Sequence, residues 1–357
     1  MPYGESFTKE WFSSEISKHH YEKAKMKTYK NLYKNLLSKD YIKQVMLENL
    51  GSKKYADKVK ANIDSYVDYI YQSLVNKNYA LKPTKTIVIH DRKKDRNITL
   101  SPYFPNKIYD YLITSQLKPI IKNSLFYWCI GNVKGKGKDM GVKYVFKMFK
   151  KNKYAVQLDI RKFYDNINKF KLYEFICKKV KDRDFTSLYK KVIGINGKGI
   201  SLGLNSSQWL ANFYLQEFDY FVKQKLKVKS YCRYVDNIVI ESNNKMRIQY
   251  FIREIILYLK KLGLEIKPNW YISDKQIKFL GYKITKTKIE LDKSLFHRLC
   301  RLWNRMKKNK SKRRARTIVS LWGWFTQTTH YNFYYSTHLK PTMSLRNIIE
   351  ISKIKVI

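Results

Sequence analysis

The chain is short of acidic residues. Only 28 Asp and Glu residues stand against 73 Lys and Arg residues, so the formal charge of the 357 residues is +45. Because the basic residues run along the whole sequence, the resulting field would attract a polyanion. Codon drift in an AT-rich genome is a second explanation for the many lysines, but it does not explain the scarcity of acids. The charge therefore favours a nucleic-acid-binding protein.

Cysteines are few and widely spaced. No two of them form a Cys-x-x-Cys pair, so neither a disulfide framework nor a zinc ribbon is predicted, and a reducing bacterial cytoplasm is the expected location. The four are Cys129, Cys177, Cys232 and Cys300. The six histidines, His90 among them, show no metal-ligand spacing. These observations exclude a small domain held together by disulfides or by a structural zinc ion.

Long apolar runs are absent as well. No stretch approaches the ~20 apolar residues that span a bilayer, so no membrane association is expected. The N-terminus carries Glu5 and Glu10 and does not resemble a signal peptide. The glycine-lysine tract 131–138 lacks the Gly-Lys-Ser/Thr ending of a P-loop, and we interpret it as a loop that contacts phosphates.

The hydrophobic pattern predicts an α+β protein. Helical spacing dominates residues 7–80, and two β-like runs at 85–90 and 96–100 flank a charged turn, which predicts a hairpin. From 154 to 286 the pattern predicts a strand that ends at Asp159, helices at 169–180, 206–226 and 246–262, a loop at 194–203, a hairpin at 231–240 and a strand pair at 264–286. This order predicts a small antiparallel sheet backed by helices. The remainder, from Leu291, is helical again and strongly basic over 301–316.

Two aspartates occupy positions suited to metal chemistry. Asp159 ends an apolar run that is typical of a strand, and Asp236 lies between two strand-like runs, followed by Asn237. Phosphoryl transfer by two magnesium ions needs hard oxygen ligands held on different strands. Either aspartate alone is equally well explained as an ordinary turn residue or helix cap. Together they favour a metal site.

Four ordered motifs resemble those of reverse transcriptases. They are Leu158–Ile167, Gly199–Asp219, Arg233–Asn237 and Phe279–Tyr282, and the resemblance extends over about 85–335. It implies a right-hand polymerase fold, with fingers at 85–153, an antiparallel-sheet palm at 154–286, and a basic helical thumb with a C-terminal tail at 287–357. A helical N-terminal extension would occupy 1–84.

The resemblance also implies an activity. The chain would be an RNA-directed DNA polymerase that makes cDNA from dNTPs by two-metal phosphoryl transfer. Two Mg²⁺ ions, replaceable by Mn²⁺, would be held by Asp159, Ile160 and Asp236, with Asn237 as the third catalytic residue. The expected partners are an RNA template and a DNA or RNA primer. The sequence leaves open a structured non-coding RNA, a small accessory protein or a homo-oligomer.

Further roles carry over from the family position by position. Tyr164 matches the steric gate that excludes a ribose 2′-hydroxyl, and Arg96, with Lys94 or Lys93, matches the cations that hold the triphosphate. The remaining expectations fall into three groups. They are Leu202, Gly203 and Gln208 for the nucleotide; Phe279, Leu280, Gly281 and Tyr282 for the primer grip; and Lys134, Lys136, Lys138, Arg301, Arg305, Arg313 and Arg314 for nucleic acid.

Within the family, Leu202-Gly203 and Ser207-Gln208 resemble diversity-generating retroelement reverse transcriptases and related antiphage-defence enzymes. These residues support a role in retroelement diversification and a role in antiphage defence nearly equally. Asn237 replaces the usual second aspartate of the hairpin, which leaves a catalytically impaired nucleic-acid-binding relative as the alternative; a different basic enzyme or scaffold is a third. Trp270 stands where the family has a lysine, so Lys267 is an imperfect match to the residue that protonates pyrophosphate.

Overall fold

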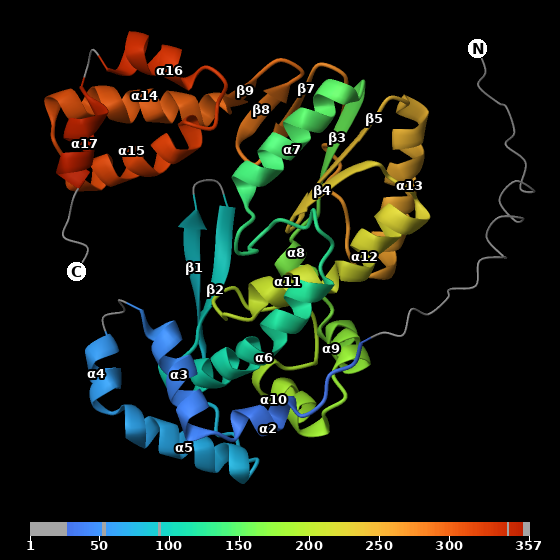
Figure 1. The fold of residues 1–357 in the computed structure, drawn as a ribbon, viewed down its shortest axis with the longest axis vertical. Helices are drawn as coiled ribbons and strands as arrows, with labels where there is room; N and C mark the ends of the chain where they lie inside the picture. Colours follow the sequence, from blue (N-terminus) through green and yellow to red (C-terminus); the bar gives the residue numbers. More distant parts are fainter. Residues whose placement is uncertain (1–26, 52–54, 92–93, 341–342, 353–357) are drawn as a thin grey trace, which may run out of the picture.

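The computed structural model describes residues 27–51, 55–91, 94–340 and 343–352. Glu5, Glu10 and Lys93, which entered the sequence predictions, lie outside these residues. Two hydrophobic cores organise the described chain. One joins the N-terminal helices to one face of a central sheet, and the other joins a second sheet to the C-terminal helices. Figure 1 shows the C-terminal helices across from the N-terminal ones, with a long hairpin between them.

Short helices form the N-terminal region, as predicted. They are α2 (Leu32–Leu36), α3 (Lys39–Leu50), α4 (Ala56–Ala61) and α5 (Ile63–Val75). The Ser38 hydroxyl caps α3 by accepting a hydrogen bond from the Tyr41 amide. These helices pack on η1 (Tyr103–Lys107) and α6 (Ile108–Ser124). They share one core with the central sheet, so the described residues of the N-terminal region form no separate core.

The predicted hairpin is confirmed. Strands β1 (Lys85–Asp91) and β2 (Lys94–Leu100) pair antiparallel over their whole length. Ile87, Val88 and Ile89 are 38%, 53% and 42% exposed, so neither face of this ribbon is covered by the described residues. The hairpin projects toward the C-terminal helices (Figure 1).

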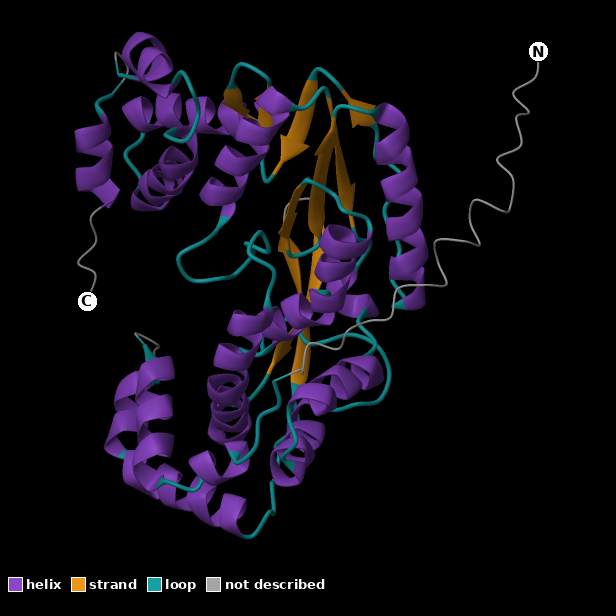
Figure 2. Ribbon diagram, turned by 45° about the vertical axis from the view of Figure 1, so that its right-hand side comes forward, coloured by secondary structure: helices purple, strands orange, loops and turns teal. Residues whose placement is uncertain are grey.

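The predicted antiparallel sheet is also confirmed. Its strand order is β4-β5-β3-β6, with β3 at Tyr154–Asp159, β4 at Ser230–Tyr234, β5 at Asn237–Ser242 and β6 at Ile272–Ser273. Val156 and Leu158 point into the same core as α8 (Phe163–Asn166), α9 (Lys169–Lys179) and α13 (Lys245–Lys261). Helices therefore back one face of the sheet, as Figure 2 shows.

Two helical predictions need correction. The single helix expected at 206–226 is broken into α11 (Ser207–Tyr214), α12 (Gln216–Tyr220) and η2 (Phe221–Lys225), because Leu215 leaves the helical conformation. A helix not expected, α10 (Arg183–Ile193), follows Asp182, whose side chain accepts from the Phe185 amide. That N-cap was the missed signal.

The strand pair expected within 264–286 is divided between two sheets. β6 joins the central sheet, whereas β7 (Gln276–Phe279) and β8 (Tyr282–Thr285) form a separate three-stranded sheet with β9 (Ile289–Leu291). This sheet packs on α7 (Lys138–Lys151). Beyond it lie α14 (Lys293–Lys308), α15 (Lys312–Phe325), α16 (Tyr331–Tyr334), η3 (Tyr335–Leu339) and α17 (Leu345–Ser352).

None of the helices in the described ranges is long and apolar enough to cross a membrane.

Candidate active site

The fold brings Asp159 and Asp236 to the same end of the central sheet. Asp159, the last residue of β3, pairs with Asn237, the first residue of β5. Asp236 immediately precedes that pair, in the turn between β4 and β5, and its carbonyl accepts a 3.0 Å hydrogen bond from the Ile160 amide. The two aspartates predicted from the sequence are therefore neighbours, one at the end of β3 and the other in the turn between β4 and β5.

Charge and burial act on this pair. Burial, and then the negative charge of Asp159, raise the pKa of Asp236 above its ordinary range. Lys267 forms an ion pair with Asp159 Oδ1, and its amide donates to the Asp159 carbonyl at 2.8 Å. Two carboxylates that repel each other bind a cation more strongly than either would alone.

Asn237 is held between two side chains. Gln157 Nε2 donates to Asn237 Oδ1 at 2.9 Å, and Asn237 Nδ2 donates to Asp236 Oδ1 at 3.1 Å. The amide assignment follows from this hydrogen-bond network. In this arrangement the amide oxygen of Asn237, which the sequence placed with the catalytic groups, is engaged by Gln157. Its side chain orients Asp236.

The donor set fits a hard cation. The described residues contain no group of three or more His, Cys, Asp or Glu side chains able to hold a metal, so these two carboxylates are not part of a larger cluster. Carboxylate and backbone carbonyl oxygens are the ligands that Mg²⁺ prefers, and Mg²⁺ keeps several waters when few protein ligands are available. Asp159, Asp236 and the backbone of Ile160 therefore suit Mg²⁺, and Mn²⁺ as well.

Backbone hydrogen bonds join the segments that carry three of the expected nucleotide-binding residues. Tyr164, on α8, accepts at its carbonyl from the Ile200 amide at 3.0 Å. The Leu202 carbonyl accepts from the Thr99 amide of β2 at 2.9 Å. Gly203 has φ of 127°, and a Cβ there would lie 2.5 Å from the Thr99 carbonyl oxygen, so glycine is required where β2 crosses.

Three other residues predicted to bind the nucleotide lie on α11 and β2. Gln208 is exposed in the first turn of α11. Lys94 and Arg96 lie on β2, paired with Asp91 and Ile89. The described part of the chain includes their backbone and not their side chains, so contact with a triphosphate stays a prediction.

A buried ion pair that the sequence analysis missed supports the turn. Arg233 and Asp219 are both fully buried and meet at two points, with Nε–Oδ1 at 2.7 Å and Nη2–Oδ2 at 2.6 Å. Arg233 Nη1 also donates to the Val235 carbonyl at 2.9 Å. Val235 has φ of 56°, which is rare for a β-branched residue, so the turn before Asp236 is strained. An arginine inside an apolar strand was the available signal.

Asp110 supports the loop that carries Leu202. Its carboxylate, on α6, accepts from the amides of Asn205 and Ser206 at 2.6 Å and 3.3 Å. Burial raises the pKa of Asp110, while these amides favour its ionised form. The start of α11 is thereby fixed against α6.

The primer-grip residues divide into core and surface. Phe279 and Tyr282 are 1% and 0% exposed, and the Tyr282 hydroxyl donates to the Trp324 carbonyl at 3.0 Å. The turn between them, Leu280-Gly281, adopts positive φ at both residues, and a Cβ on Gly281 would lie 2.6 Å from the Trp324 ring. Contact of this turn with a primer stays a prediction.

The loop lysines differ from one another. Lys134 is exposed, whereas Lys136 lies 4.3 Å from the Tyr127 ring centroid and donates to the Tyr127 carbonyl. The Lys138 ammonium is buried 3.5 Å from the Trp324 ring centroid, and burial lowers its pKa to about 8. Lys138 thus connects α7 to α15, and Lys134 is the loop lysine best placed for a phosphate.

The basic residues on the C-terminal helices also differ. Arg301, Arg305 and Arg313 are exposed. Arg314 donates from Nη1 to the carbonyls of Arg305, at 3.3 Å, and Asn309, so it caps the end of α14. In the described chain, the side chains of the first three do not cap a helix in this way. They remain candidates for phosphate contact.

Paired carboxylates at a hairpin turn, an antiparallel sheet backed by helices, and a basic helical region define a polymerase of the right-hand class. The chain belongs to the reverse transcriptase (RNA-dependent DNA polymerase) family, whose pattern it matches over residues 82–284.

Comparison with individual proteins agrees with the family. The chain is 29% identical over 133 residues to the retron Ec73 reverse transcriptase of Escherichia coli, a match that covers 33% of this chain and 42% of that protein. It therefore spans less than half the length of this relative.

Two telomerase structures are also similar to it. The apo telomerase of Candida tropicalis, truncated from its C-terminal domain, has a TM-score of 0.44 and 17% identity, over 58% of this chain and 55% of that one. The telomerase of Candida albicans, in complex with a fragment of telomeric RNA, has a TM-score of 0.46 and 11% identity, over 79% and 61%.

Proposed function

We propose that the chain is an active RNA-directed DNA polymerase that synthesises cDNA by two-metal phosphoryl transfer. The observation that carries this proposal is the placement of Asp159 and Asp236 at one sheet end, where burial and then the charge of Asp159 raise the pKa of Asp236. Such a pair is suited to two divalent cations, which would clamp the attacking and leaving oxygens. Asp159, Ile160 and Asp236 would hold them.

In this proposal, the residues expected near Asp159 and Asp236 have different roles. Tyr164 borders the sugar and excludes a 2′-hydroxyl, while Leu202 and Gly203 face the base pair from the loop fixed to β2. Asn237 keeps Asp236 oriented through its amide hydrogen. Lys267, which neutralises Asp159 in the structure, would move away when cations bind there.

The biological setting is a domesticated bacterial or phage system. The resemblance to diversification enzymes rests on Leu202-Gly203 and Ser207-Gln208, whereas the similarity to a retron reverse transcriptase favours the other branch, which includes antiphage defence. The proposed partners are an RNA template, a DNA or RNA primer and a structured non-coding RNA. Sequencing the nucleic acid that copurifies with the protein would separate the two settings.

A catalytically impaired, nucleic-acid-binding relative is the second candidate. Two observations favour it. An amide replaces the second carboxylate of the turn, and Lys267 forms an ion pair with Asp159. Both reduce the negative charge available to cations.

Primer extension on an RNA template, with Mg²⁺ or Mn²⁺, tests the proposal. Wild type should extend the primer, whereas Asp159→Asn and Asp236→Asn should each abolish extension and leave template binding intact. Asp274→Asn, at an exposed turn outside the site, is the matched control and should retain activity. Binding without extension by wild type, under both metals, would favour the impaired relative.

A further inference from the structure

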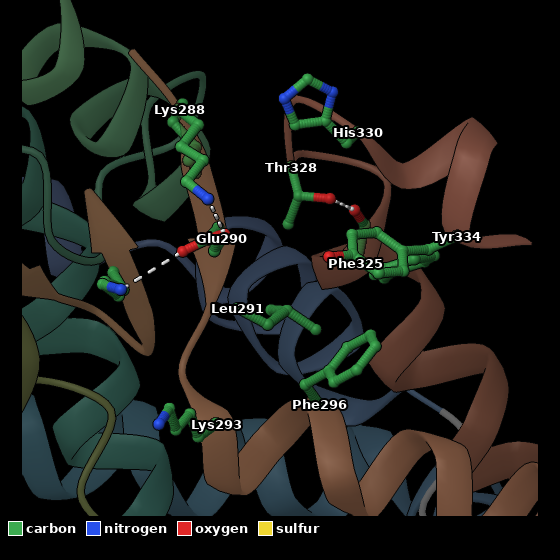
Figure 3. Close-up of a pocket in the computed structure, with 11 residues that line it drawn as sticks. Lys288, Glu290, Leu291, Lys293, Phe296, Phe325, Thr328, His330 and Tyr334 are labelled. Carbon is green, nitrogen blue, oxygen red and sulfur yellow. Dashed lines mark hydrogen bonds and ion pairs between the residues drawn. The ribbon is translucent and has the colours of Figure 1, made fainter. Parts of the chain in front are cut away.

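A cavity of about 270 Å³ lies among the C-terminal elements, outside the site described above. It is enclosed by β8 and β9, the start of α14, the end of α15 and α16. Figure 3 shows its lining: the aromatic side chains and Leu291, here called the floor, lie beside the lysines and Glu290, here called the rim. The cavity is slightly smaller than typical sites for drug-sized ligands, so it would take a group no larger than about one nucleoside.

The floor offers flat apolar surfaces. Leu291 and Phe325 are 6% and 2% exposed, whereas Tyr334 is 36% exposed. The Phe296 ring lies 5.5 Å from the Tyr334 ring and 6.1 Å from the Phe325 ring, centroid to centroid. Rings left partly open in this way are stacking platforms for a planar group, since every nucleobase has a π-face.

The rim is positively charged. Lys288 Nζ lies 2.7 Å from Glu290 Oε1, and Lys283 Nζ lies 3.5 Å from Glu290 Oε2. The hydrogen bond from Lys288 holds the pKa of Glu290 below its ordinary range, so this carboxylate is ionised. With Lys293, the lining holds three ammonium groups and one carboxylate. The rim therefore keeps an excess of two positive charges, which suits an anion.

The cavity shares no lining residue with the candidate active site, whose surroundings are here called the cleft. Tyr282 and Ile284 of β8 are buried in the core against α7, so Lys283, which alternates with them, lies on the other face of the sheet. In Figure 1, α16 lies on the side of α14 opposite the β1–β2 hairpin. A duplex held between that hairpin and α15 would not reach the cavity.

We infer that this cavity binds one unpaired nucleotide of an RNA that wraps around the outer side of the C-terminal helices. The base would stack on the open face of Tyr334, next to Phe296, and the flanking phosphates would meet Lys288 and Lys293. An apolar peptide would use the floor but not the lysines, and a duplex would use the lysines but not the floor. The inference rests on the proposed function, because it requires an RNA ligand.

Photocrosslinking tests the inference on the full chain. The probe is a single-stranded RNA of about 12 nucleotides, within the usual range of single-strand site sizes, that carries one 5-iodouridine. This base crosslinks to aromatic rings on which it stacks. Peptide mapping should find one crosslink at Phe296 or Tyr334, and separate crosslinks in the cleft around Leu202.

Two variants and two controls identify the cavity as the source. Tyr334→Ala and Lys293→Gln should each lower the cavity crosslink about tenfold and leave cleft crosslinks unchanged. Lys293 is exposed, so its variant tests the idea even if Tyr334→Ala weakens the fold. The matched controls are Phe333→Ala, an exposed ring on the same helix, and Lys245→Gln on α13; neither should change the cavity crosslink.

The possible failures can be told apart. Cleft crosslinks without a cavity crosslink would overturn this inference and leave the polymerase proposal standing. Loss of the cavity crosslink in the presence of free AMP or UMP, with RNA affinity equal in wild type and Lys293→Gln, would show a mononucleotide site and overturn the RNA assignment. An absence of cleft crosslinks together with absent primer extension would instead reject the proposed function.

Discussion

Asn237 donates its side-chain amide hydrogen to Asp236 Oδ1 at 3.1 Å, and Gln157 fixes the orientation of that amide from the neighbouring strand. A carboxylate at position 237 would still accept from Gln157 but would no longer donate to Asp236. The substitution that makes this chain unusual for its family therefore exchanges negative charge for a hydrogen bond to the aspartate beside it.

The first prediction concerns this exchange. Asn237→Asp should retain primer extension and lower the Mg²⁺ concentration needed for half-maximal rate by several-fold, because a third carboxylate adds attraction for cations. Asn237→Leu should raise that concentration, since Asp236 loses its orienting donor. Rates measured across a magnesium titration decide the matter. If Asn237→Asp is inactive at all concentrations, the amide hydrogen is indispensable and the charge argument is wrong.

The second prediction concerns the buried pair beneath the turn. Arg233→Met should destabilise the fold by about 3–5 kcal/mol, because Asp219 would remain buried without its partner. Replacing both, with Arg233→Met and Asp219→Leu, should recover much of that stability. Activity should stay low in the double variant, since the Val235 carbonyl has lost its donor and the strained turn its support.

Chemical denaturation and primer extension on the same samples check this prediction. Full recovery of both stability and activity in the double variant would reduce Arg233 to a packing role.

The third prediction is a pH dependence of stability. Burial raises the pKa of Glu241 to about 8 from an ordinary 4.5, and Ser230 donates to Glu241 Oε2. Between those values the folded chain holds a proton that the unfolded chain releases, so stability falls as pH rises, by about 1.4 kcal/mol per pH unit at most. Glu241→Gln should remove this part of the decline.

Denaturation at pH 5.5 and 7.5 measures it as the difference between wild type and variant. Equal declines in both proteins would mean that Glu241 ionises in the fold without cost.

The fourth prediction concerns the C-terminal helices. Reversing the exposed charges of Arg301, Arg305 and Arg313 should weaken duplex binding for all sequences and flatten its salt dependence, by about 0.9 in slope for each lost contact on B-form DNA, with a similar trend for hybrids. The same number of reversals on α13, at Lys245, Arg253 and Lys260, is the control. A slope that changes in the control set alone would place the duplex elsewhere.

Sequence alone predicted the features that local chemistry determines. Apolar runs next to Asp159 and Asp236 predicted the strands, and the alternation of strands with helices predicted the sheet. It could not predict what depends on distant partners. The bond from Gln157 to Asn237 spans 80 residues, and Lys138 could not be recognised as buried without Trp324.

The division of 264–286 between two sheets shows the same limit. β6 pairs with Ala155 and Val156, more than a hundred residues earlier, whereas β7 pairs with the strand that follows it. Periodicity predicts that a segment is a strand, but the partner is chosen by packing. The cavity among the C-terminal elements likewise joins residues from β8 to α16 that share no motif.

Leu202 gives the sharpest test of which branch of the family this chain represents. Its carbonyl is fixed to Thr99, so the backbone beside the expected base pair is held in place whatever the side chain. A glutamine there could hydrogen-bond near the nascent pair, whereas leucine offers only shape. The lost discrimination is about 1 kcal/mol, the net worth of one hydrogen bond, or several-fold more misincorporation.

Leu202→Gln should therefore lower the error rate, most visibly opposite template adenines if the chain serves diversification. The measurement is the error spectrum of both proteins on one RNA template. Wild-type accuracy equal to that of ordinary reverse transcriptases, or a repetitive product made without an external template, would end the diversification reading and favour defence.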